Sequence, residues 1–261
     1  MTGSGTQPTQ TPRSAGEQRQ ATAIILAGGR GERLRPYTDD RPKPMIELNG
    51  VPLIAYLLGW LLKYDVTQVV LSCGYRWEAL RSALGTGEQW GLKIQYAVEQ
   101  ERLGRGGGIR FAMQVAGLDR PDTGPVIVTN GDNLLDMNLH AMLEHHAKMQ
   151  TLATLALAPL VSARGIVDTD AQNRVTGFRE KPELPYWFNA GVYVLDPSIA
   201  DLLPVKGDHE ETLFPRLAAQ SRLAAFKTRR LWRTVDTAKD LTTLTNELRA
   251  GLEVPCVDWT Q

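Results

Sequence analysis

The sequence predicts an α/β protein in which helices cover both faces of a mostly parallel, mixed sheet. Three observations lead to this prediction. Apolar runs alternate with helix-like segments along the chain, and the first run, at residues 23–26, is apolar throughout, as a strand buried on both faces is. A glycine-rich stretch follows that run directly. A buried strand that leads into glycines is typical of the ligand-binding edge of a Rossmann-like three-layer sandwich.

The predicted elements continue in this alternation to the end of the domain. The helix at residues 52–64 is apolar nearly all round, as a buried helix is. Residues 166–170 and 174–178 are predicted to form a hairpin outside the half that carries the glycines. The other predicted helices lie at residues 77–84, 109–116, 139–149, 210–222 and 239–250, and the other strands at 66–72, 93–98, 125–129, 151–160, 188–195 and 223–227.

The bulk composition limits the domain organisation and the partners. The 261 residues suffice for one large domain with a small insertion. We expect a disordered tail at residues 1–20, the domain at 21–250 and a C-terminal extension at 251–261, because the tail has almost no aliphatic side chains. The 29 Lys and Arg balance 29 Asp and Glu, which predicts neither a nucleic-acid nor a membrane partner. Two distant cysteines and no long apolar segment favour the cytoplasm.

The glycine-rich stretch predicts a phosphate site. Gly28, Gly29 and Gly31 let the backbone approach an anion closely, and successive N–H groups can point into one concavity. The spacing fits neither a dinucleotide fingerprint, because Leu34 stands where the third glycine is expected, nor a P-loop. Cationic side chains suited to phosphate oxygens follow at Arg30, Arg33, Arg35 and Lys43.

A second polar segment follows the predicted strand at residues 125–129. It reads Asn130-Gly131-Asp132. Ligands of open α/β sheets bind beyond the carboxyl ends of the strands. We therefore expect Asp132 to face the glycine-rich stretch.

The stretch LAGG at residues 26–29, with Gly31, Arg33, Leu34, Pro36 and PKPM at 42–45, resembles the signature of sugar-1-phosphate nucleotidyltransferases. Five separated motifs resemble that family in order, and the resemblance covers residues 22–248. Glu32 departs from the family pattern, which usually has a small hydroxyl residue there. The family implies a Mg²⁺-dependent transferase that joins a nucleoside triphosphate to a sugar 1-phosphate and releases pyrophosphate.

The resemblance also implies roles for particular residues. Arg33 would stabilise the β- and γ-phosphates and Lys43 the α-phosphate, while Asp132 and Asp236 would hold Mg²⁺. Residues implied at the nucleotide are Leu26, Ala27, Gly28, Gly29, Gly31, Glu99, Gly104, Asn130 and Gly131. Those implied at the sugar phosphate, in a small inserted sugar-binding β lobe, are Glu180, Lys181, Asn189 and Gly191.

The second metal position has two candidates. Strict alignment places Thr234 where the family usually has an acidic residue. The sequence Trp232-Arg-Thr-Val-Asp236-Thr resembles instead the glucose-1-phosphate cytidylyltransferase branch, which implies Asp236.

Residues 99–108 resemble the second nucleotide loop of the family, with Arg105 in place of the usual threonine and three glycines, at 106–108, ahead of a helix. Glu99 stands where relatives that choose uracil or thymine have glutamine. A carboxylate offers only acceptors, which suit the adjacent N–H donors of guanine, so GTP is favoured. The ending at Asp236 favours CTP instead. Cytidylyl-, uridylyl- and thymidylyltransferases, a non-catalytic sugar-nucleotide-binding regulatory subunit and a homo-oligomer all stay open.

Overall fold

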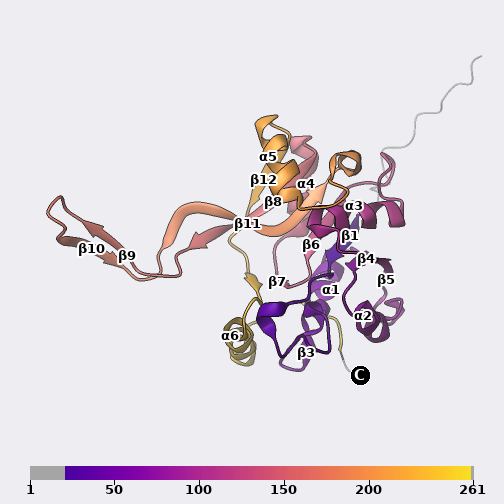
Figure 1. The fold of residues 1–261 in the computed structure, drawn as a ribbon, viewed down its shortest axis with the longest axis horizontal. Helices are drawn as coiled ribbons and strands as arrows, with labels where there is room; N and C mark the ends of the chain where they lie inside the picture. The colour runs from indigo at the N-terminus through magenta and orange to yellow at the C-terminus, as the bar shows by residue number, and fades with distance from the viewer. Residues whose placement is uncertain (1–20, 260–261) are drawn as a thin grey trace, which may run out of the picture.

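A seven-stranded sheet in the order β12-β8-β11-β6-β1-β4-β5 runs through the body of the protein (Figure 1). The computed structural model describes residues 21–259, so the tail expected at residues 1–20 lies outside the described residues. Four adjacent strands are parallel: β1 (Thr22–Leu26), β4 (Gln68–Cys73), β5 (Lys93–Val98) and β6 (Val126–Asn130). The antiparallel strand β11 (Glu183–Leu195) joins β6 to β8 (Ala153–Val161), and β12 (Leu223–Lys227) pairs parallel with β8.

Helices cover both faces of this sheet, which confirms the predicted fold class. One core cluster joins the sheet to α1 (Leu53–Lys63), α2 (Trp77–Leu84) and α4 (Leu139–Met149). The other cluster joins it to α3 (Gly104–Ala116) and α5 (His209–Ala219), with η4 (Pro197–Leu202) beside them. Ile25 belongs to the first cluster and Ile24 to the second, so β1 is buried on both faces, as its sequence predicts.

A short antiparallel pair lies beside the main sheet and was not predicted. β7 (Asn133–Leu135) pairs with β13 (Trp232–Thr234), which precedes α6 (Ala238–Arg249). The loop after β1 carries η1 (Glu32–Leu34), η2 (Lys43–Met45) and the strands β2 (Glu47–Leu48) and β3 (Val51–Pro52). A third cluster, which includes Leu34, Leu48 and Leu244, packs this loop against α6. The cluster thereby holds the glycine loop and the segment before α6 together.

The helix start near residue 104 corrects the expectation of a glycine loop before a helix at residue 109. Helix α3 begins at Gly104 and includes all three glycines. The N–H groups of Gly106 and Gly107 both donate to the carbonyl oxygen of Gly207, at 2.9 and 3.2 Å. A Cβ atom on Gly106 would lie 2.7 Å from the nitrogen of His209. Packing this close outweighs the poor helix propensity of glycine.

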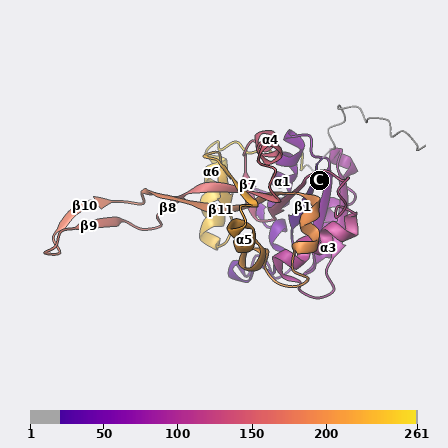
Figure 2. The same cartoon turned by 90° about the horizontal axis from the view of Figure 1, so that it is seen from above.

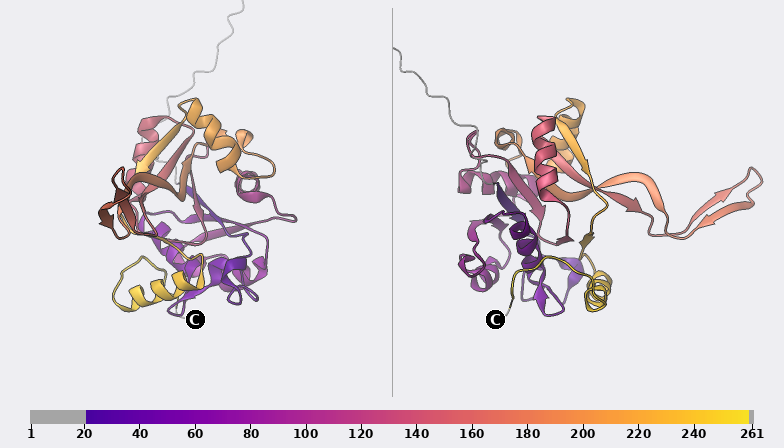
Figure 3. Two further views of the ribbon diagram at one scale, coloured as in Figure 1. Left: turned by 60° about the vertical axis from the view of Figure 1, so that its left-hand side comes forward. Right: turned by 180° about the vertical axis from the view of Figure 1, so that it is seen from behind.

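The predicted hairpin lies at the end of an arm. Strands β8 and β11 run out of the body, and β9 (Ile166–Thr169) and β10 (Val175–Arg179) pair at the far end (Figures 1, 2 and 3). The hairpin therefore lies away from the half that carries the glycines, as the sequence predicts, and its part in a sugar-binding lobe stays a prediction. The C-terminal segment, residues 251–259, runs along α1, where the N–H of Val257 donates to the carbonyl oxygen of Ala55 at 3.2 Å. None of the helices in residues 21–259 combines the length and the apolar character that a bilayer crossing requires.

Candidate active site

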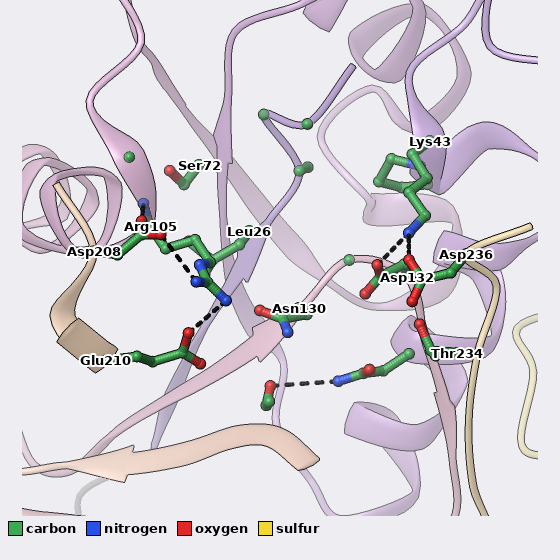
Figure 4. A pocket seen from close by; sticks show the side chains of 18 of the residues that line it. Leu26, Lys43, Ser72, Arg105, Asn130, Asp132, Asp208, Glu210, Thr234 and Asp236 are labelled. Atoms are coloured by element: carbon green, nitrogen blue, oxygen red, sulfur yellow. Dashed lines mark hydrogen bonds and ion pairs between the residues drawn. The ribbon is translucent and has the colours of Figure 1, made fainter. Parts of the chain in front are cut away.

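A cavity of about 620 Å³ lies at the carboxyl ends of β1, β4 and β6. The backbone at Leu26, Ala27, Gly28 and Gly29 forms one wall, directly after β1. The segment Asn130–Gly131–Asp132, which begins at the last residue of β6, forms another (Figure 4). A second cavity of about 880 Å³ adjoins the first and shares with it Gly28, Gly29, Arg33, Lys43, Glu99, Arg102, Asp132 and Asp236.

Lys43 joins two carboxylates that lie far apart in the sequence. Its Nζ atom donates to Oδ2 of Asp132 at 2.5 Å and to Oδ1 of Asp236 at 2.8 Å (Figure 4). Nη2 of Arg33 donates to the same Asp236 oxygen at 2.9 Å. The Lys43 side chain is only 13% exposed, whereas that of Arg33 is 72% exposed. Two cations and two carboxylates thus meet at one edge of the cavity.

The β7–β13 pair produces this convergence. Asn133 pairs with Thr234, and the N–H of Val235 lies 3.4 Å from the carbonyl oxygen of Asp132. Asp132 directly precedes β7 and Asp236 lies two residues after β13, so the pairing brings the two aspartates together. Thr234 also lines the cavity, but the contacts to Lys43 and Arg33 are made by Asp236.

The start of α6 fixes the backbone at Asp236. Thr237 and Asp240 form a capping box, in which Oδ2 of Asp240 accepts from the N–H of Thr237 at 2.8 Å and from that of Asp236 at 3.2 Å. The carboxylate of Asp236 projects from a backbone that a helix cap holds in place.

The donor set between Asp132 and Asp236 fits a Mg²⁺ ion. Both groups supply the hard oxygen ligands that Mg²⁺ prefers, and both already contact one cation, the Lys43 ammonium. Within residues 21–259 no group of three or more His, Cys, Asp or Glu side chains forms a metal cluster. An ion held by two carboxylates and the phosphates of a bound substrate matches the usual mode of Mg²⁺ binding.

Glu99 lines the cavity beside the start of α3. Its Oε1 accepts from the hydroxyl of Ser72 at 3.2 Å and its Oε2 from the N–H of Leu103 at 3.1 Å. These two donors fix the carboxylate at the end of β5. Gly104, which begins α3, lines the cavity next to it.

The wall opposite Lys43, Asp132 and Asp236 carries a hydrogen-bonded acidic residue, Glu210 (Figure 4). Nδ2 of Asn189 and the hydroxyl of Tyr193 both donate to Oε1 of Glu210, at 2.8 and 2.7 Å. Burial, with the Glu210 carboxylate adding to it, raises the pKa of Tyr193. Nη1 of Arg105 lies 2.5 Å from Oε2 of Glu210. Phe188, Gly191 and Trp232 complete this wall.

The structure brings together most of the residues singled out in the sequence. Arg35 lines neither cavity and pairs with Asp39 at 3.4 Å. Glu180 and Lys181 also line neither cavity. They lie on the arm, where the carbonyl oxygen of the next residue, Pro182, accepts from the N–H of Ser162 at 2.9 Å. Gly31 lines the second cavity only. Lining residues that sequence reasoning did not assign to the site are Ser72, Arg102, Arg105, Asn133, Phe188, Asp208, Glu210 and Trp232. For Glu210, the sequence offered one signal, the acidic residues at the start of α5, which are also typical of any helix start.

Residues 22–251 match the model of the nucleotidyl transferase family, and the chain belongs to that family. It is 34% identical over 241 residues to mannose-1-phosphate guanylyltransferase from Mycobacterium tuberculosis, which covers 89% of this chain and 66% of the relative. It is also 34% identical over 209 residues to D-glycero-alpha-D-manno-heptose 1-phosphate guanylyltransferase from Aneurinibacillus thermoaerophilus, with 78% of this chain and 88% of the relative covered. This chain thus spans less than two thirds of the length of the Mycobacterium relative.

The fold is shared with solved structures of low sequence identity. HddC from Yersinia pseudotuberculosis aligns with a TM-score of 0.69 at 24% identity, over 88% of this chain and 100% of that one. HddC complexed with GMP-PN aligns with a TM-score of 0.68 at 22% identity, with the same shares covered. These likenesses confirm the predicted α/β fold.

Proposed function

We propose that this protein transfers the guanylyl group of GTP to a sugar 1-phosphate, giving an NDP-sugar, here a GDP-sugar, and pyrophosphate. The observation that carries the proposal is the meeting of Asp132 and Asp236 on Lys43, at the carboxyl ends of the strands and beside a glycine loop. A phosphate oxygen of the sugar 1-phosphate attacks the α-phosphorus of GTP, and pyrophosphate leaves. The two reactants are both anions, so the site must position them and neutralise their charge.

The residues of this chain divide that work. The backbone from Leu26 to Gly29 lies beside the triphosphate, and Gly31, Asn130 and Gly131 flank the triphosphate. The exposed Arg33 reaches the β- and γ-phosphates. Lys43 turns from the carboxylates to the α-phosphate. A Mg²⁺ ion bound by Asp132 and Asp236 would screen the phosphate charges and favour in-line geometry.

Glu99 supports guanine as the base. Its carboxylate accepts from Ser72 and Leu103 and keeps further acceptor capacity for the adjacent N–H donors of guanine, with Gly104 beside it. The guanylyltransferase relatives point to the same base. They also make mannose 1-phosphate and manno-heptose 1-phosphate the first acceptors to test.

The sugar subsite is proposed at Asn189 and Gly191 together with Glu210. Glu180 and Lys181 can reach the sugar phosphate only if the arm bends toward the cavity. We place the reaction in the cytoplasm, where GTP and sugar phosphates meet in a reducing environment.

The test is a grid of GTP, CTP, UTP and dTTP against mannose, manno-heptose and glucose 1-phosphates with Mg²⁺, read as pyrophosphate release. We expect release with GTP and a manno-configured acceptor, and a loss of about 10²-fold or more in kcat for Asp132→Asn. The matched control is Asp136→Asn, because Asp136 pairs with Lys63 at 2.6 Å and does not line the cavity. No release from any pair would overturn the assignment as an enzyme, and a regulatory sugar-nucleotide-binding protein would give that result.

A further inference from the structure

Arg105 crosses the cavity from the start of α3 to the start of α5. Its backbone N–H donates to Oδ1 of Asp208 at 2.8 Å, its Nη2 to Oδ2 of the same residue at 2.9 Å, and its Nη1 contacts Glu210. The Arg105 guanidinium holds the pKa of Asp208 below its usual range. Figure 4 shows this group on the opposite side of the cavity from Lys43, Asp132 and Asp236. The group therefore lies away from Lys43 and its carboxylates, and through Glu210 it contacts Asn189 of the proposed sugar subsite at 2.8 Å.

The carboxylate of Glu210 is held in one orientation. Two donors, Asn189 and Tyr193, occupy its Oε1 atom. Its Oε2 atom faces Arg105 and has one lone pair left. The Glu210 side chain is 23% exposed and that of Arg105 is 44% exposed, so a ligand in the cavity can reach both. One acceptor is thus presented to the cavity at a fixed position.

Arg105 presents donors at the same place. A guanidinium has five N–H groups in a planar fork, and after the contacts to Asp208 and Glu210 some of these groups can still donate a hydrogen bond. An acceptor and a donor that lie side by side match a hydroxyl, which donates one hydrogen bond and accepts another. A carboxylate on the ligand would instead face Asp208 and Glu210. A methylene would leave the spare lone pair of Glu210 and the spare N–H groups of Arg105 without a ligand partner.

We propose that Arg105 and Glu210 together bind a single hydroxyl of the acceptor sugar, at a ring or side-chain carbon away from the 1-phosphate, and thereby select uncharged, hydroxylated sugars. This inference rests on the proposed function, because it takes the acceptor to be a sugar 1-phosphate. A site built to hydrogen-bond a substrate hydroxyl discriminates strongly against the analogue that lacks it, since the site's own polar groups lose their partner.

The test compares mannose 1-phosphate with its 2-, 3-, 4- and 6-deoxy analogues, using GTP and Mg²⁺. For the wild type we expect one of the four deoxy compounds to lose about 10-fold or more in kcat/KM relative to the others. Arg105→Met should reduce that preference to about 3-fold or less, chiefly by lowering kcat/KM for the hydroxylated sugar. Arg105→Lys, which keeps the charge but not the fork, should retain part of it. The KM for GTP should change by less than about 3-fold in both variants.

A matched control separates recognition from folding and from general charge. Arg102→Met removes another cavity-lining arginine of the same loop and should leave the ranking of the deoxy analogues unchanged. Melting temperatures and GTP binding verify that each variant is folded. An active wild type whose ranking is the same in Arg105→Met overturns the inference and leaves the proposed function intact. A wild type that releases no pyrophosphate from any pair overturns the proposed function itself.

Discussion

The ammonium of Lys43 lies 2.8 Å from the carboxylate of Asp236, although 193 positions separate the two residues in the sequence. The same nitrogen also contacts Asp132, so one ammonium bridges both carboxylates in the free protein. If Mg²⁺ binds between these carboxylates, as proposed, it would have to take over the role of the ammonium. Lys43 and the metal would then compete until a phosphate drew the lysine away.

Lys43→Met should make metal binding visible without substrate. Because the two carboxylates lose their shared partner, we expect the variant to be less stable in EDTA and to gain several degrees in Tm with millimolar Mg²⁺ or Mn²⁺, while the wild type gains about 2 °C or less. Its kcat should fall by about 10²-fold or more. The control is Lys63→Met, whose ammonium contacts Asp136 at 2.6 Å. Equal metal responses of the Lys43 variant and the wild type would contradict a shared cation position.

Glu99→Gln should weaken the preference for GTP. To keep the hydrogen bond from the N–H of Leu103, the amide must use its oxygen there, which turns its NH₂ group toward Ser72 and leaves fewer acceptors for the base. We expect kcat/KM for GTP to drop by about 10-fold or more, with a smaller change for UTP. Glu101→Gln is the matched control, because Glu101 pairs with Lys206 at 2.8 Å and is exposed. A GTP-to-UTP ratio that stays at the wild-type value would remove Glu99 from base selection.

Local patterns were sufficient for elements whose burial follows directly from the sequence. The strand Lys93–Val98 and the helices Trp77–Leu84 and Leu139–Met149 have the predicted bounds, and the strand Thr22–Leu26 begins one residue before the apolar run that predicts it. The predicted start of α3, at residue 109, was wrong. The glycines at 106–108 are helical because they pack closely against residues 204–209, and no local pattern reveals that contact. Tertiary packing overrides propensity there.

The site was predictable in its residue types but not in its geometry. The glycine loop, Lys43 and Asp132 follow from single segments, whereas the choice between Thr234 and Asp236 depends on a pairing of three-residue strands that lie almost 100 positions apart. Strands this short carry no usable periodicity. The distance of Glu180 and Lys181 from the cavity likewise depends on the path of the arm, which the hairpin signal alone does not define.

Gly59→Ala should detach the C-terminal segment from α1. A Cβ atom on Gly59 would overlap the backbone of Cys256, so residues 251–259 must move. The hydrogen bond between Val257 and Ala55 and the stacking of Trp259 on Trp90, with ring centroids 5.3 Å apart, would be lost. We expect a Tm lower by several degrees and faster proteolysis near residue 256.

Removing residues 254–261 from both backgrounds is the control for Gly59→Ala. Without the segment, alanine should be neutral or stabilise α1 by up to about 1 kcal/mol, because alanine has the better helix propensity. Equal destabilisation of the full-length and shortened chains would show that the clash lies elsewhere.

His209 should make the stability of the protein depend on pH. Its ring is 1% exposed, packs edge-on against Tyr193 and Phe214, and has no hydrogen-bond partner for either nitrogen within the described residues. Burial lowers the pKa of His209 to about 4, against the opposing effect of Glu210. The unfolded chain therefore takes up a proton near pH 6.5 that the folded protein accepts only near pH 4, so stability falls as the pH is lowered through this interval.

The size of this effect can be measured by urea unfolding at pH 7 and pH 5. We expect the wild type to lose about 1–2 kcal/mol from His209 between these values, with a further loss in the same direction from His146, whose pKa is also lowered by burial. His209→Phe keeps an aromatic ring and removes the titration, so its loss should be smaller. His140→Gln, at an exposed position, should behave as the wild type does. If His209→Phe lost as much stability as the wild type, the folded protein would have to accept the proton on His209 without cost, which its burial among aromatic rings opposes.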